Sequence, residues 1–191
     1  RHSNEETIEK QEEIKDLNKE KTEKLLAENK FLKIQNTKLK ENVKELYCAD
    51  KNICKVAQYS SYVGGFLNYI GLGGEYRYNN FTDFETKRST ARTNLDRELK
   101  QNYQDSKIDE YKEEGDPKKD IEILSKKNKS LKENNSKLKK IGNRLIENSD
   151  ALYKIAKPDS WLATLDKWLK GTRYPALEST NSRHILLGQD I

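Results

Sequence analysis

The amino-acid sequence predicts an all-α, elongated protein in which two heptad-repeat helices flank a small aromatic and glycine-rich module. Composition is the first reason, because only 33% of the 191 residues are apolar, 36% are charged and the mean hydropathy is -1.08. Such a chain has too little apolar material for an ordinary core and must gather it into narrow stripes. The second reason is a leucine at every seventh residue in two separate stretches. This spacing places the leucines on one continuous edge of a helix.

The first repeat lies in the predicted N-terminal coiled coil, residues 1–47, and contains neither Gly nor Pro. With the leucines at heptad position d, Asn29 and Asn36 occupy position a. Glu28, at position g, can then reach Lys33 at position e of a parallel neighbouring helix. The residues expected in this seam are Leu25, Asn29, Leu32, Asn36, Leu39, Val43 and Leu46.

The second repeat lies in the predicted second coiled coil, residues 116–157, where Asp116 suits the N-cap and Pro117 the first helical position. When the first leucines are aligned, Asn29 corresponds to Asn128 and Lys33 to Lys132. An internal duplication or a shared compositional bias explains this match. The residues expected in this seam are Leu124, Asn128, Leu131, Asn135, Leu138, Leu145 and Leu152.

Both stretches resemble leucine-zipper coiled coils, over about 25 and about 35 residues. The resemblance implies a helical association motif. An asparagine at position a is tolerated when it meets another asparagine across a parallel, in-register pair. The sequence therefore predicts a parallel homo-oligomer that also binds other proteins of an assembly, and it leaves open whether the zippers pair within or between chains. The run 130–135 also resembles the coiled-coil tails of some plasmid-mobilisation relaxases, whose catalytic histidine motif is absent from this sequence.

Residues 48–86 form a predicted Tyr- and Gly-rich module. The run from Tyr76 to Phe81, with Asn79–Asn80 at its centre, fits a β-hairpin with a tight turn. The apolar stretch 63–72 is expected to pack between helices, with insertion into a lipid surface as the alternative. Cys48 and Cys54 do not have zinc-site spacing, and they form either a local disulfide or, as we expect, two unpaired thiols.

Three further segments complete the predicted domain organisation. Residues 87–115 are expected to form a charged connecting helix, residues 158–171 a Trp-bearing amphipathic helix, and residues 172–191 an extended tail. The apolar face of the amphipathic helix is expected to dock on its own protein or in a partner's groove. Its docking residues are Trp161, Leu165, Trp168 and Leu169.

The sequence gives no indication of enzymatic activity. Its only histidines, His2 and His184, lie near the two ends, and no phosphate-binding glycine loop is present. We therefore predict no catalytic, cofactor-binding or metal-ligating residues and no cofactor. No apolar run reaches the roughly 18 residues of a transmembrane helix.

The two segments that could bind nucleic acid differ in their charge. Residues 1–21, which precede the first zipper, carry five basic and seven acidic side chains, unlike a DNA-binding basic region. Residues 118–157 carry twelve basic and five acidic side chains, a net charge of +7. The sequence thus predicts a non-enzymatic coiled-coil scaffold or structural assembly protein, such as a component of a virion, a filament or a surface apparatus. The alternative is a nucleic-acid-associated dimer that uses the basic second helix. The compartment is left open.

Overall fold

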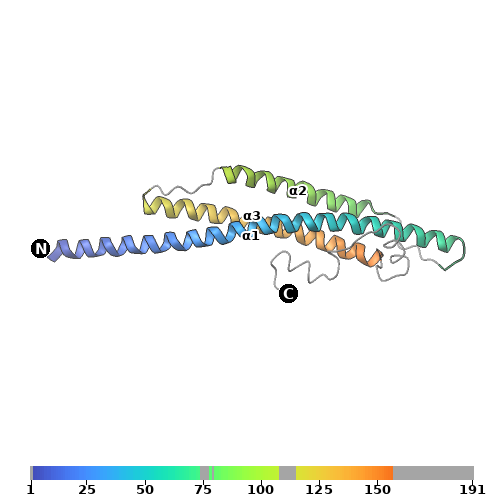
Figure 1. Cartoon of the computed structure of the whole chain (residues 1–191), viewed down its shortest axis with the longest axis horizontal. Coiled ribbons are helices and arrows are strands. Elements are labelled where there is room, and N and C mark those ends of the chain that lie inside the picture. The colour runs from blue at the N-terminus through green and yellow to red at the C-terminus, as the bar shows by residue number, and fades with distance from the viewer. Residues whose placement is uncertain (1, 74–77, 79, 108–114, 157–191) are drawn as a thin grey trace. The chain divides into compact units, whose positions relative to one another are not determined.

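The chain is all-helical over the residues that its computed structural model describes, which are 2–73, 78, 80–107 and 115–156. Figure 1 shows the three helices: α1 spans His2–Tyr69, α2 spans Thr82–Lys107 and α3 spans Pro117–Ala156. Over these residues, no helix has an apolar stretch long enough to cross a membrane. The all-α prediction is confirmed, whereas the elongated shape stays a prediction.

The chain divides into two compact units, each built from segments distant in sequence. The first unit comprises residues 1–38 and 101–136, and the second comprises residues 39–100 and 137–191. In the first unit, α1 and α3 run parallel, because Asn29 contacts Asn128 and, seven residues later, Asn36 contacts Asn135.

The second unit contains parts of all three helices in an up-down-up arrangement. Contacts of α1 with α2 run in opposite sequence directions, since Gln58 bonds Glu85 whereas Asp50 bonds Arg88. A parallel α1 and α3 enclose most of its apolar side chains, and α2 contributes the rest. One cluster comprises Leu39, Val43, Leu46, Ala91, Leu95, Leu138, Ile141, Leu145 and Ile146. The other comprises Ile53, Cys54, Val56, Ala57, Phe84, Leu152 and Ala156.

Helix α3 begins as its sequence predicts. Asp116 Oδ1 accepts a hydrogen bond from the backbone N–H of Lys118 at 3.1 Å, and Pro117 is the first helical residue. Proline is well suited to this position because its missing N–H would have no partner inside the helix. The N-cap and the proline therefore fix the start of the second repeat.

Helix α1 extends further than the predicted coiled coil, because it continues without a break across residue 47 to Tyr69. The predicted β-hairpin is not confirmed: Tyr78, Asn80 and Phe81 belong to no strand, while Tyr76 and Asn79 lie outside the described residues. Tyr78 instead packs edge-on against Phe81 and Phe84, with ring centroids 5.1 and 5.4 Å apart. In a hairpin, Tyr78 and Phe81 would have lain on paired strands, whereas here their rings pack against each other.

The predicted connecting helix over 87–115 corresponds in part to α2, which begins earlier, at Thr82. Asn80 Oδ1 accepts the N–H of Thr82 at 3.1 Å, which makes an Asx turn just before this start. Residues 108–114, the Trp-bearing segment 158–171 and the tail 172–191 lie outside the described residues. The proposed domain boundaries stay predictions.

Two leucines of the second repeat differ in burial, so replacing each of them should destabilise the fold to a different extent. Leu138 is fully buried in the second unit, whereas Leu131, one heptad earlier, is partly exposed. We expect Leu138→Ala to lower the free energy of unfolding by about 2–5 kcal/mol, because the deletion leaves a cavity, and Leu131→Ala to cost about half as much or less. Urea unfolding followed by circular dichroism measures both, and equal losses would contradict this packing.

Candidate functional site: a polar seam between helices

A ladder of buried asparagine side chains joins α1 to α3 in the first unit. Asn29 Nδ2 donates to Asn128 Oδ1 at 2.8 Å, and both side chains are buried. Asn128 Nδ2 donates in turn to the backbone oxygen of Leu25 at 3.0 Å and to Glu28 Oε2 at 3.1 Å. Each amide thus finds partners inside a seam that excludes water, which is the condition for burying it without a large penalty.

The same arrangement repeats one heptad later. Asn36 Nδ2 donates to Asn135 Oδ1 at 2.8 Å and also to Asn134 Oδ1 at 2.6 Å. Asn135 Nδ2 donates to Gln35 Oε1 at 3.2 Å and approaches the backbone oxygen of Leu32 at 3.5 Å. Two successive rungs with one pattern favour one register, because a shift by one heptad would keep a single asparagine pair and leave one asparagine of each helix without an amide partner.

An ion pair flanks the first rung. Lys132 Nζ donates to the Glu28 carboxylate, and this hydrogen bond is the main reason why the pKa of Glu28 lies below its ordinary value. Glu28 occupies position g of α1 and Lys132 position e of α3. This is the pair expected between parallel coiled-coil helices, and here it forms within one chain.

The structure buries most of the predicted seam residues. In the first unit Leu32 and Leu124 are buried, while Leu25 and Leu131 are partly exposed. In the second unit the seam residues are all buried: Leu39, Val43, Leu46, Leu138, Leu145 and Leu152. Their predicted role in oligomerisation is a separate question, and it stays a prediction.

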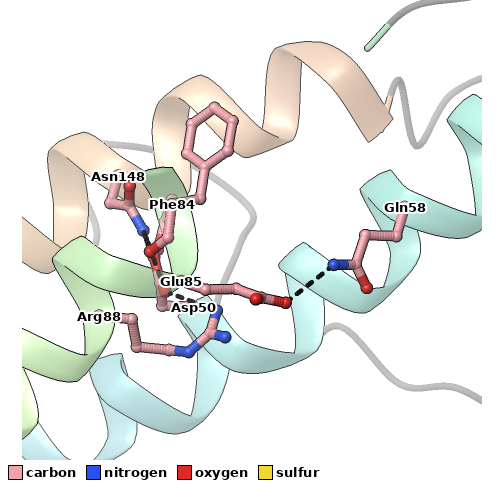
Figure 2. A network of polar contacts seen from close by, with 7 residues as sticks. Asp50, Gln58, Phe84, Glu85, Arg88 and Asn148 are labelled. Carbon is pink, nitrogen blue, oxygen red and sulfur yellow. Dashed lines mark hydrogen bonds and ion pairs between the residues drawn. The ribbon is translucent and has the colours of Figure 1, made fainter. Parts of the chain in front are cut away.

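A buried aspartate, Asp50, is the centre of a second polar cluster, in the second unit (Figure 2). Its side chain has no exposed surface. Asn148 Nδ2 donates to both of its carboxylate oxygens at 3.2 and 3.0 Å, and Ser149 Oγ donates to Oδ2 at 3.0 Å. Arg88 of α2 approaches Oδ1 at 3.4 Å. Asp50 therefore connects all three helices.

Burial dominates the electrostatics of this cluster. Removal of the carboxylate from water raises the pKa of Asp50 above its ordinary 3.8, although the bonds from Asn148 and Ser149 and the charge of Arg88 act in the opposite direction. Burial also raises the pKa of the nearby Cys54 thiol. A carboxylate with no exposed surface cannot reach a substrate, so its chemistry is that of an internal hydrogen-bond acceptor.

Sequence reasoning missed Asp50, although a signal was present. Position 50 is the a position after Val43, and Ser149 occupies position a of the second repeat. The two residues are 99 apart in sequence, the same offset that separates Asn29 from Asn128. Continuation of the heptad past Leu46 would therefore have predicted a polar contact at this point.

The remaining predicted site residues fall in two groups. Both cysteines have free thiols: Cys48 is exposed and Cys54 is buried. The predicted docking residues Trp161, Leu165, Trp168 and Leu169 lie outside the described residues. Among the residues that the structure describes, no group of three His, Cys, Asp or Glu side chains could hold a metal ion.

A shallow groove of about 410 Å³ lies between α2 and α3 in the second unit. Phe84, Ala91 and Asn148 are among its lining residues, and the exposed charged residues Lys87, Arg144 and Glu147 also contribute. Asn148 Oδ1 is buried without a hydrogen-bond partner, because the amide directs its Nδ2 donor to Asp50 and to the Phe84 carbonyl oxygen. The groove therefore lies beside a polar cluster whose donors are already committed.

The asparagine ladder predicts a non-additive response to mutation. Asn128→Ala should lower the free energy of unfolding by about 1–3 kcal/mol, because it leaves the Asn29 amide buried without its partner. The double variant Asn29→Ile and Asn128→Ile should be at least as stable as wild type, because two apolar side chains then fill the same seam. Thermal unfolding of the full chain tests this, and additive losses would contradict a ladder.

The Asp50 cluster predicts a pH dependence of stability. A raised folded-state pKa means that the folded chain binds the Asp50 proton more tightly than the unfolded chain. The resulting stabilisation is complete below the unfolded-state pKa, near 3.8, and is lost as pH rises through the folded-state value. We expect the unfolding free energy of wild type minus that of Asp50→Asn to fall over this window and then level off. A difference that rises with pH would show that the donors outweigh burial.

Comparison with protein-family models, with curated proteins and with solved structures found no match to this chain. Its function must therefore be argued from its own contacts.

Proposed function

We propose that this chain is a non-enzymatic coiled-coil scaffold that mediates protein–protein association, as a structural component of a larger assembly. The observation that carries the proposal is the pair of asparagine rungs, at Asn29 and Asn36, in a parallel and in-register seam. Polar residues at position a reduce coiled-coil stability but specify register and partner. A seam of this kind suits a protein whose task is selective association.

The preferred partner of the first zipper is the same segment of a second copy. In a parallel α1 pair, Glu28 of each helix faces Lys33 of the other, which gives two attractive pairs. In the α1 and α3 pair, Glu28 meets Lys132, but the same register sets Lys127 opposite Lys33. Charge therefore favours the pairing of α1 with α1, and the asparagines are equally compatible with it.

Pairing between copies requires exchange, since α3 already occupies the seam of α1 in the first unit. The polar rungs make such exchange accessible, because a seam interrupted by asparagines is less stable than one of leucine and isoleucine alone. The scaffold would then assemble by replacement of an internal helix with the equivalent segment of a neighbour.

The alternative, a nucleic-acid-associated dimer, requires α3 lysines that are available to phosphates. Three of the exposed lysines already pair with acids of their own chain: Lys126 with Glu122, Lys132 with Glu28 and Lys137 with Glu98. Exposed ion pairs are weak and do not prevent phosphate binding. Glu28 of α1 and Glu98 of α2 do offset part of the net positive charge of α3, which favours the scaffold.

Cysteine cross-linking of the full chain tests the exchange. In a Cys48→Ser background, which removes the exposed native thiol, Asn36→Cys should form a disulfide-linked dimer under mild oxidation, because parallel α1 helices bring equivalent a positions together. The dimer fraction should rise with protein concentration. Non-reducing electrophoresis measures it.

Thr37→Cys in the same background is the matched control, because this adjacent position is exposed and faces away from the seam. It should form little dimer. The pair Asn36→Cys and Asn135→Cys should form an internal cross-link at low concentration, where the chain is monomeric. If Asn36→Cys gives no more dimer than Thr37→Cys at any concentration, α1 does not pair with α1.

A further inference from the structure

An exposed apolar face marks the C-terminal end of α1. Tyr62, Phe66 and Tyr69 are spaced by four and three residues, so they lie on one side of the helix. Their exposed fractions are 79%, 57% and 88%, far above those of packed aromatic residues. Phe66 and Tyr69 belong to residues 63–72, so the expectation that this stretch packs between helices does not hold for these two rings, and insertion into a lipid surface is the remaining alternative.

The chain holds this end of α1 in a defined conformation. Gly71 has a φ of 77°, and its N–H donates to the Asn68 carbonyl, while the N–H of Leu72 reaches back to the Leu67 carbonyl at 2.9 Å. These two bonds and the left-handed glycine form a Schellman cap. Ile70 and Leu72 are exposed at its tip. The apolar surface thus belongs to a capped helix end rather than to a frayed one.

The charges that α1 itself contributes to this face are positive, and Glu85 of α2 is the acidic side chain beside it, held by Gln58 at 3.0 Å. Lys51 and Lys55 are exposed and continue the spacing of Tyr62 and Phe66 towards the middle of the helix. No Asp or Glu occurs between residues 51 and 72. The face therefore changes along α1 from cationic, through aromatic, to aliphatic at the tip.

We propose that this face, formed by Lys51, Lys55, Tyr62, Phe66, Tyr69, Ile70 and Leu72, docks on an anionic lipid surface without crossing it. Aliphatic side chains reach the acyl boundary, tyrosines suit the headgroup region, and lysines attract anionic headgroups.

Two other occupants fit less well. In a parallel pair with a second copy, the lysines of the two faces would meet each other. A single-stranded nucleic acid is bound by cations interleaved with stacking rings, whereas here the cations lie at one end and the aliphatic residues at the other.

Vesicle flotation with the full chain tests the inference. Wild type should bind vesicles of phosphatidylcholine with 30% phosphatidylserine, and bind pure phosphatidylcholine at least about tenfold more weakly, because lysines near an anionic surface each contribute on the order of 1 kcal/mol. Lys51→Gln with Lys55→Gln should reduce this preference by about tenfold or more. Phe66→Gln with Tyr69→Gln should abolish most binding to either vesicle. Circular dichroism checks that both variants stay helical.

The matched control is Phe31→Gln with Ile34→Gln, which removes another exposed apolar pair of α1 and should leave vesicle binding unchanged. Equal binding by wild type and Phe66→Gln/Tyr69→Gln overturns the proposal, as does no binding to either vesicle. If wild type does not bind vesicles and Phe66→Gln/Tyr69→Gln has a lower native mass than wild type, the face binds a second copy of the chain. That result would also overturn the proposal. The inference is independent of the proposed exchange, because none of its variants alters the asparagine seam.

Discussion

Hydrogen bonding between buried amides is the constraint on which the register of this protein depends. A purely apolar seam between two long helices tolerates a shift by one heptad, because one leucine replaces another at little cost. Asn29 and Asn36 make such a shift costly in the first unit, since it would keep one asparagine pair and break the other. An asparagine shifted opposite an apolar residue at position a, such as Ile121, would lose its amide partner and cost about 1–3 kcal/mol. The asparagines thus lower the stability of the seam and favour a single alignment of α1 with α3.

The second unit uses a charged group for the same purpose. Asp50 accepts hydrogen bonds from two side chains of α3 and contacts Arg88 of α2, so one carboxylate coordinates three helices. Burial of this carboxylate is unfavourable, as the direction of its pKa shift shows. The ionised carboxylate is therefore a cost to folding that its hydrogen bonds only partly offset, and the cluster requires α2 to present Arg88 at the level of Asp50. A two-helix seam has no such requirement.

Much of the fold follows from sequence periodicity, and the failures have physical causes. The strict leucine spacing and the Asp116–Pro117 start made α3 predictable, because caps and heptads are local signals. The end of α1 was not predictable in this way, since Gly64 and Gly65 lower helix propensity by about 1 kcal/mol each and indicated a separate module. Helix α1 nevertheless includes both glycines and ends only at Tyr69. Contacts from distant segments, such as Ser60 Oγ donating to the Ala156 carbonyl, contribute to this outcome and cannot be read locally.

The site residues also divide into those that local sequence signals predicted and those that depend on distant contacts. Asparagines at position a and the Glu28 position at g were visible because coiled-coil rules assign them roles. These rules do not say whether the partner helix belongs to the same chain. The similarity of the two repeats left that question open, because each repeat is chemically suited to pair with itself or with the other. Asp50 could have been found by continuing the heptad past Leu46, whereas its partner Arg88 was not predictable from the repeats. Their contact joins α1 to an antiparallel α2, and nothing in the heptad pattern specifies a third helix.

In the proposed exchange, pairing within a chain and pairing between chains would use the same side chains, so their balance would depend on concentration. A linked helix competes with an effective concentration on the order of millimolar. When two chains exchange, two pairs of Glu28 with Lys132 become two pairs of Glu28 with Lys33, and the opposition of Lys127 to Lys33 is relieved, which is worth roughly 1 kcal/mol for exposed groups, or about fivefold. This preference is too small to overcome the linked helix in dilute solution. Under the proposed function, it would become decisive where copies are held close together, as in a filament, a shell or an array on a surface. The same seam would then keep the isolated chain closed and join neighbouring chains once an assembly concentrates them.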